Sequence, residues 1–265
     1  MDQACLLEIQ HLFVKYPCGK AVLQDVSLRL QKREILCVIG ESGSGKSTLL
    51  QAILRMPGKV EITRGEILFA GQDLCALKGE AMRNVRGKGI GMVFQEPGAS
   101  LNPVRKIGTQ FYETLRAQGP ISRRQADEKA RSLLNCLDLA DPEHILRSYP
   151  VQLSGGMNQR VAIALAMALE PEVLLADEPT SALDVTVQVQ IVAELLKLRE
   201  QFGTGILVVT HNMGVVAKIA DTVAVMAGGK IVEYGSRDQV LGSPSHTYTQ
   251  SLLAAVPKLV RTCHA

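Results

Sequence analysis

The strongest constraint on the fold is the run GESGSGKST at positions 40–48, which matches the pattern G-x-x-x-x-G-K-[ST] in full. The apolar stretch EILCVIG before it is typical of a buried strand, and STLLQAIL after it has the composition of a helix. Glycines let the backbone curl so that N–H groups point at phosphate oxygens, and the start of the next helix adds positive charge. The alternative is a glycine-rich strand-to-helix turn that matches this pattern by chance. The strand before the run and the helix after it are, however, the flanks that a phosphate loop requires. The run therefore predicts a phosphate-binding loop.

The residues of this loop that we expect to contact phosphate or metal are Gly40, Ser42, Gly43, Ser44, Gly45, Lys46, Ser47 and Thr48. The Lys46 ammonium would bridge the β- and γ-phosphates of a nucleotide, and the Ser47 hydroxyl would ligate Mg²⁺. Kinases, GTPases and ATPases all use loops of this kind, so the reaction must be inferred from a second motif.

That second motif is Val173–Glu178, VLLADE, an apolar strand that ends in two carboxylates. Asp177 would hold Mg²⁺ directly or through water, and Glu178 would orient or deprotonate the attacking water. This role favours hydrolysis over transfer to a substrate hydroxyl. Two acids in a solvated turn are the structural alternative. No N-K-x-D segment for reading guanine is present, which disfavours a GTPase.

Strand-like segments lie on both sides of a helical stretch. Residues 1–30 are strand-like, and short apolar runs return after Glu170 in alternation with helical segments. From about Val104 to Glu170 the spacing of apolar residues is helical. The pattern predicts an α/β fold with a parallel core and an inserted helical subdomain. The length of 265 residues suits one large domain or two small ones.

Composition and charge exclude several classes of protein. The net charge of +3 is too small to indicate nucleic acid or an acidic partner by itself. The longest apolar run, Val161–Leu169, falls well short of the roughly 20 residues of a membrane-spanning helix, and no secretory leader is visible. The six cysteines form no C-x-x-C pair, which predicts free thiols and neither a zinc site nor a cysteine-ligated cluster. We expect an intracellular chain.

The segment Leu153–Met157, LSGGM, stands shortly before the aspartate strand, and with it the chain resembles the ATP-binding subunit of an ABC transporter. In that family the segment contacts the γ-phosphate of ATP held by the other nucleotide-binding domain, which implies this role for Ser154, Gly155 and Gly156. A serine can cap the following helix, glycines permit close approach, and the helix dipole favours an anion. Taken alone, S-G-G is a common helix start.

Four further residues match motifs of the family in the expected order. Gln95 resembles the Q-loop glutamine, which contacts Mg²⁺ and the water and links the site to the helical subdomain. Asp184 ends a segment that resembles the D-loop, which crosses to the partner domain. His211 resembles the switch histidine, which touches the γ-phosphate. Tyr16 stands where the family places an aromatic that stacks on adenine, a contact of about 1–3 kcal/mol. A surface or core tyrosine is the alternative for Tyr16.

Within the family, three features resemble the peptide/nickel importer branch: FQEPGASLNP at 94–103, the variant S-G-G-M, and the tail segments 243–252 and 255–259. The branch implies two membrane-spanning permease subunits, an extracytoplasmic solute-binding protein, and a head-to-tail dimer with a second ATP-binding subunit, either a paralogue or a second copy. It also implies ATP and Mg²⁺ as cofactors, a peripheral place at the cytoplasmic face of the membrane, and no nucleic-acid partner. The solute stays open among a peptide, nickel and a metal chelate.

The resemblance also implies the architecture. A P-loop ATPase core would combine a mixed, largely parallel sheet with an N-terminal antiparallel β portion and an inserted helical subdomain. Residues 1–97 and 171–265 would form the core, and residues 98–170 the helical subdomain, of one nucleotide-binding domain.

Three departures from the family pattern bear on these expectations. Met157 replaces the usual glutamine, and we expect the site to survive because Ser154 and backbone groups make the main phosphate contacts. Asn212 replaces the aspartate that often follows the switch histidine, and it keeps a helix-capping side chain. Many members of the branch carry a cysteine group near the C-terminus. Only Cys263 stands there in this sequence, so no iron–sulfur cluster is expected.

Two rival functions are disfavoured. A soluble ABC-type ATPase of translation or DNA repair would carry two ATPase domains, long coiled coils or zinc modules, and none of these is visible in the sequence. A domain that binds ATP without cleaving it would leave Glu178 and His211 unexplained.

Overall fold

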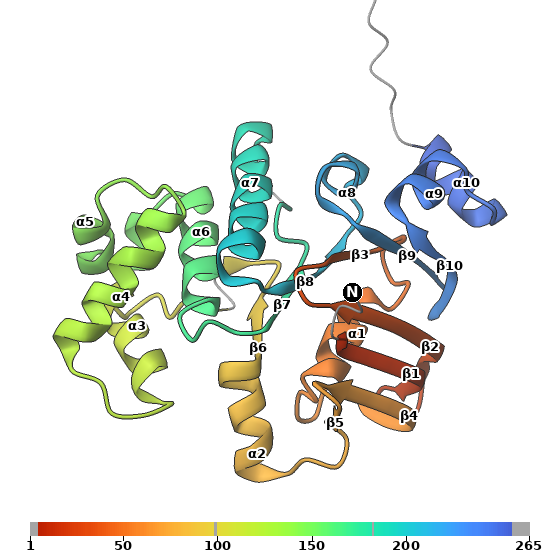
Figure 1. Cartoon of the computed structure of the whole chain (residues 1–265), viewed down its shortest axis with the longest axis horizontal. Coiled ribbons are helices and arrows are strands. Elements are labelled where there is room, and N and C mark those ends of the chain that lie inside the picture. Colours follow the sequence, from red (N-terminus) through yellow and green to blue (C-terminus); the bar gives the residue numbers. More distant parts are fainter. Residues whose placement is uncertain (1–4, 98–99, 182, 256–265) are drawn as a thin grey trace, which may run out of the picture.

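The structure, a computed structural model, describes residues 5–97, 100–181 and 183–255 and places their strands in two sheets (Figure 1). The strands are β1 (Cys5–Lys15), β2 (Ala21–Gln31), β3 (Ile35–Ile39), β4 (Glu61–Phe69), β5 (Gln72–Asp73), β6 (Ile90–Val93), β7 (Val173–Asp177), β8 (Gly205–Thr210), β9 (Thr222–Ala227) and β10 (Lys230–Ser236). An antiparallel sheet has the order β2-β1-β4-β5, and a larger sheet has the order β10-β9-β3-β8-β7-β6. The predicted N-terminal antiparallel portion is confirmed.

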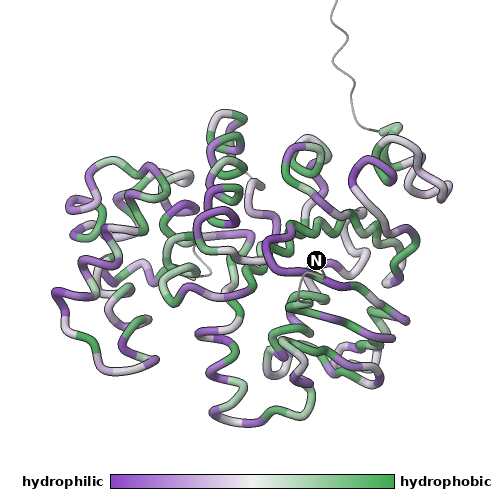
Figure 2. The backbone as a smooth tube through the Cα atoms, viewed as in Figure 1, coloured by the Kyte–Doolittle hydropathy of each residue, from purple (hydrophilic) through white to green (hydrophobic). Residues whose placement is uncertain are grey.

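The larger sheet is mixed and largely parallel, as predicted. Strand β3 pairs in parallel with β8 and β9, and β7 pairs in parallel with β8 and β6, whereas β10 runs antiparallel to β9. Every residue of β3 and β8 is buried, which is why these strands are continuous apolar runs and not alternating ones. Figure 2 shows the central strands as hydrophobic segments.

The helices are α1 (Lys46–Ile53), α2 (Gly79–Asn84), α3 (Ile107–Arg116), α4 (Arg123–Cys136), α5 (Pro142–Arg147), α6 (Gly155–Ala166), α7 (Val185–Phe202), α8 (Met213–Ile219), α9 (Arg237–Gly242) and α10 (Thr247–Ala254), with a π-helical turn at Val85–Gly89 and a 3-10 turn at Pro150–Gln152. Within the described ranges, no helix combines the length and the apolar character that a membrane crossing requires.

The larger sheet separates two apolar cores, because successive side chains of a strand point to opposite faces. Ile35, Cys37 and Ile39 of β3 pack with the helices α3 to α8. Leu36 and Val38 pack with α1 and the antiparallel sheet on the other face. The sheet is therefore covered on both sides, and its strand ends are left free to carry polar loops.

The predicted helical insertion is present between β6 and β7, where α3, α4 and α5 lie on the side of the molecule away from the antiparallel sheet (Figure 1). Helix α6 joins this group to α7: Arg160 of α6 forms a buried ion pair with Glu194 of α7 and also donates to the carbonyl oxygen of Leu137, just after α4. Burial raises the pKa of Glu194 to about 7, and Arg160 acts against this rise. One apolar core runs from α3 through α6 to β3. The division into a core and a subdomain at 98–170 therefore stays a prediction.

Candidate functional site

Four neighbouring parallel strands deliver the polar residues of the site. The order β3-β8-β7-β6 brings the carboxyl ends of these strands to one edge of the sheet. The phosphate loop follows β3, His211 follows β8, Glu178 follows β7 and Gln95 follows β6. In open α/β sheets this edge is the usual place for ligands.

Glycines make the turn from β3 into α1. Gly43 and Gly45 have φ angles of 81° and 109°, which side-chain-bearing residues rarely adopt. A Cβ atom at Gly40 would lie 2.1 Å from the carbonyl oxygen of Met226. A larger residue at Gly40 would therefore displace the loop from β9.

Lys46 is buried at the start of α1. Its Nζ donates to the carbonyl oxygens of Gly40 and Glu41, each at 2.8 Å. Burial lowers the pKa of Lys46, and the nearby carboxylates of Glu178 and Asp177 oppose that change. The ammonium group is thus held inside the loop next to two acids.

Two oxygen-bearing side chains, one from α1 and one from β7, contact each other beside this lysine. The Ser47 hydroxyl donates to Asp177 Oδ1 at 3.0 Å. Burial raises the pKa of Asp177, and the hydrogen bond from Ser47 opposes the rise. Ser44 Oγ is also buried and has no hydrogen-bond partner among the described residues. A hydroxyl and a carboxylate side by side are hard ligands of the kind that Mg²⁺ takes.

Glu178 and His211 form a pair at the ends of neighbouring strands. Glu178 Oε1 lies 2.8 Å from His211 Nδ1, with Glu178 buried and the histidine exposed. Glu178 has a φ of 46°, an uncommon conformation for a residue with a side chain. Its N–H donates to Val209 O at 2.8 Å, which fixes the end of β7 on β8. The carboxylate position is therefore set by the backbone and by the imidazole.

Lys46, Ser47, Glu178 and His211 share one cleft of about 460 Å³, which Ser44 and Asp177 do not line. The residues that line it are Tyr16, Val22, Ser42, Gly43, Gly45, Lys46, Ser47, Thr48, Gln95, Glu178 and His211. The structure thus brings together the predicted phosphate loop, Gln95, Glu178, His211 and Tyr16. The Tyr16 hydroxyl lies 3.1 Å from Thr48 Oγ1, so the tyrosine is attached to the loop. Val22 was not predicted as a site residue, because nothing in the sequence distinguishes an apolar strand residue that lines a binding cleft from one that packs in the core.

The predicted signature and D-loop residues do not line this cleft. Ser154 is the N-cap of α6 and accepts from Met157 N at 3.2 Å, and Asp184 is the N-cap of α7 and accepts from Val187 N at 2.9 Å. Ser154, Gly155 and Asp184 are exposed. Both helix starts therefore face solvent in the single chain.

Two of the three departures have a structural explanation. Met157 packs its side chain against the core and supplies the N–H that Ser154 accepts, so the cap does not need the usual glutamine. Asn212 caps α8 by accepting from Gly214 N at 3.0 Å and Val215 N at 3.3 Å, as predicted. Cys263 lies outside the described residues.

Gly156 is required by packing between α6 and α7. A Cβ atom there would lie 2.8 Å from Val187 Cγ1, whereas one at Gly155 would meet nothing within 4 Å. We expect Gly156→Ala to lower the free energy of unfolding by about 1–3 kcal/mol through overpacking. Gly155→Ala serves as the control and should change the free energy far less in the same urea titration. Adding Val187→Ala should restore part of the loss, and strict additivity of the two changes would contradict the contact.

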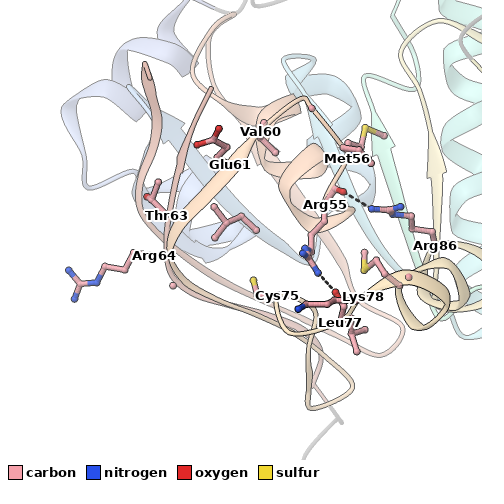
Figure 3. Close-up of a pocket in the computed structure, with 16 residues that line it drawn as sticks. Arg55, Met56, Val60, Glu61, Thr63, Arg64, Cys75, Leu77, Lys78 and Arg86 are labelled. Carbon is pink, nitrogen blue, oxygen red and sulfur yellow. Dashed lines mark hydrogen bonds between the residues drawn. The ribbon is translucent and has the colours of Figure 1, made fainter. Parts of the chain in front are cut away.

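A larger cavity of about 900 Å³ lies apart from this cleft, between the end of α1, β4 and α2 (Figure 3). Two of its three arginines are bound to backbone carbonyls. Arg55 Nη1 lies 2.7 Å from Leu74 O, and Arg86 Nε lies 2.8 Å from Leu54 O, at the C-terminal end of α1. No residue predicted for the site lines this cavity. Arg55 and Arg86 attach the segment after β5 and the π-helical turn after α2 to the end of α1.

A phosphate loop with a buried lysine, close to an Asp-Glu pair at the end of the next parallel strand but one, defines a P-loop nucleoside-triphosphate hydrolase. Residues 23–181 match the family model described as ABC transporter. The chain belongs to the ABC transporter family. It binds nucleotide and is the ATP-hydrolysing subunit of an ABC importer.

Named relatives cover nearly the whole chain. The oligopeptide transport ATP-binding protein OppD of Bacillus subtilis is 46% identical over 96% of this chain and 72% of that protein. The dipeptide transport ATP-binding protein DppD of the same organism is 41% identical over 96% of this chain and 77% of that protein. Among solved structures, a dimeric post-hydrolysis state of the ATP-binding cassette MJ0796 bound to ADP and Pi has a TM-score of 0.78 and 29% identity, over 88% of this chain and 99% of that chain.

Proposed function

We propose that this subunit drives uptake of a peptide solute by hydrolysing ATP in the cleft between the phosphate loop, Glu178 and His211. The observation that carries the assignment of catalytic roles is the Glu178–His211 contact of 2.8 Å in the same cleft as Lys46. A buried carboxylate beside the site of the γ-phosphate can serve as the base for water, a function that simple nucleotide binding does not require.

Ser47, Asp177 and Gln95 are the residues that would hold Mg²⁺. The Ser47 hydroxyl and the Asp177 carboxylate are already 3.0 Å apart, and Gln95 lines the same cleft as Ser47, so these oxygen ligands fit a cation such as Mg²⁺. When bound, Mg²⁺ supplies charge neutralisation to the β- and γ-phosphate oxygens.

The chain's own residues divide the work of hydrolysis. Lys46 binds the β- and γ-phosphates through its ammonium group. Glu178 orients the attacking water and takes its proton, while His211 holds the carboxylate and reaches the γ-phosphate. Tyr16, attached to the phosphate loop through Thr48, stacks on adenine. Catalysis in this scheme is mostly positioning and electrostatic stabilisation.

A second ATP-binding subunit completes each site. Ser154, Gly155, Gly156 and Asp184 would act on the nucleotide of the partner in a head-to-tail dimer. The exposure of Ser154 and Asp184 at two helix starts supports this arrangement, because neither residue lines the cleft of its own chain. A helix start favours anions, and the cassette MJ0796 is described as a dimer.

The names of the relatives support a peptide as the solute over nickel or a metal chelate. OppD and DppD are named for oligopeptide and dipeptide transport, and the relative GsiA of Salmonella typhimurium for glutathione import. The chain would act at the cytoplasmic face of the membrane with two permease subunits, and an extracytoplasmic binding protein would deliver the solute. This assignment leaves no role for nucleic acid.

Reconstitution tests this function. The chain, its permease subunits, its ATPase partner and its binding protein would be assembled in lipid vesicles, and accumulation of labelled di- and oligopeptides would be measured. We expect accumulation that requires ATP and the binding protein. ATP hydrolysis without accumulation of any peptide, or accumulation of nickel alone, would contradict the proposed solute.

A further inference from the structure

We propose that Tyr248, on the C-terminal helix α10, is a positioning residue for the phosphate loop, because it fixes the peptide group that holds Lys46. The inference deepens the proposed function and rests on the role of Lys46 in it. Segment 243–252 matches the importer branch in sequence, but none of its residues takes part in the proposed hydrolysis. A positioning role for Tyr248 gives this segment a function.

The contact joins two distant parts of the chain. Glu41 N donates a hydrogen bond to the Tyr248 hydroxyl at 3.1 Å. Lys46 Nζ donates to Gly40 O at 2.8 Å. The carbonyl of Gly40 and the N–H of Glu41 belong to the same peptide group. One side chain therefore binds each end of this group, the lysine at its oxygen and the tyrosine at its nitrogen.

This peptide group needs such a contact because the local backbone leaves it free. It follows a glycine, whose conformational range is wide, and Glu41 itself is exposed. Hydrogen bonds at the two ends of one peptide group also polarise each other, so the bond at Glu41 N strengthens the acceptor that Lys46 uses. The tyrosine thus sets both the orientation of Gly40 O and its strength as a partner of the ammonium group.

Tyr248 is held in place independently of the phosphate loop. Glu233 of β10 accepts hydrogen bonds from Ser245 N at 2.7 Å and from His246 N at 3.2 Å, which fixes the start of α10 on the sheet. His246 Nδ1 then caps the helix by accepting from Tyr248 N at 3.1 Å. Tyr248 itself packs half-buried against the core. The hydroxyl is therefore presented to the loop by a helix whose start is hydrogen-bonded to β10 and which lies beside α9 (Figure 1).

The chain offers a matched control. The Tyr234 hydroxyl is likewise hydrogen-bonded to a backbone group, although it donates, to Arg29 O at 3.1 Å, and the contact lies on the antiparallel side, away from the cleft. Tyr248→Phe and Tyr234→Phe each remove one hydroxyl that is bonded to the backbone. ATP affinity would be measured with Mg²⁺ on the 265-residue chain, and KM and kcat on the assembled transporter.

For Tyr248→Phe we expect Kd and KM for ATP to rise about three- to tenfold, the factor that the loss of one hydrogen bond gives, with kcat at saturating ATP changed by less than about twofold. For Tyr234→Phe we expect all three constants within about twofold of the wild-type values. Equal Kd values for the two variants would overturn the proposal.

Thermal unfolding separates positioning from a general structural role. Without nucleotide, Tyr248→Phe should unfold at the same temperature as Tyr234→Phe, but the rise in Tm that ATP produces should be smaller, because that rise reports affinity. A lower Tm without nucleotide together with a normal rise on adding ATP would overturn the proposal. If the wild-type chain shows no ATP-dependent rise at all, the proposed function fails and not the role of Tyr248 within it.

Discussion

Replacing Glu178 by glutamine is expected to lower ATP hydrolysis by the assembled transporter about a thousandfold, within the range that a lost general base gives. The amide keeps the shape of the carboxylate and its contact with His211, but it cannot take a proton from water. ATP binding should stay within about threefold of the wild-type Kd, because a residue that acts on the attacking water contributes mainly to the transition state. Steady-state phosphate release and equilibrium ATP binding measure the two effects.

Glu172→Gln is the matched control for this change. Glu172 directly precedes the other end of β7 and is exposed, so the same loss of a carboxylate there should leave turnover within about twofold. A Glu178→Gln complex that releases phosphate at the wild-type rate would show that another group activates the water.

Replacing Ser154 by aspartate is expected to lower hydrolysis at least about a hundredfold, the effect of removing one donor to developing charge, without weakening ATP binding by the isolated chain. Aspartate caps helices as well as serine does, so α6 should remain intact. Its carboxylate would stand against the phosphates of the partner's ATP in the closed dimer. The cleft of the same chain should be unaffected, because Ser154 does not line it.

Two further variants serve as the negative and the positive control for this prediction. Ser236→Asp changes the exposed N-cap of α9, which lies outside the site, and should leave hydrolysis and binding unchanged. Lys46→Ala removes the cation of the cleft and should abolish ATP binding by the isolated chain as well as hydrolysis. If Ser154→Asp also abolished binding by the isolated chain, the serine would act within its own subunit, and the head-to-tail arrangement would be wrong.

The parts of the site that the sequence predicted are those set by local patterns. Residues 40–45 form a loop because their glycines permit it, α1 begins at Lys46, and Asp177 with Glu178 ends a strand whose apolar run is plain in the sequence. The capping roles of Ser154 and Asn212 also follow from residue type at a helix start.

The parts that the sequence did not predict depend on tertiary contacts. The order β3-β8-β7-β6, which brings Gln95, Glu178 and His211 to one edge, comes from pairings between strands far apart in the chain. Helices α2, α9 and α10 are too short to show a helical period, so the tail had no predicted structure and Tyr248 no predicted partner. The left-handed backbone conformation of Glu178 could not be predicted either, because a glutamate in the sequence does not indicate a positive φ angle.

The connection between α6 and α7 has a consequence for how the dimer would close. The helix starts that would reach the partner, at Ser154 and Asp184, belong to two helices that touch at Gly156 and Val187 and are joined again by the Arg160–Glu194 ion pair. We therefore expect the two starts to move together. They would reach or leave the partner's nucleotide in one step, so that closure at the signature and at the D-loop behaves as a single all-or-none event.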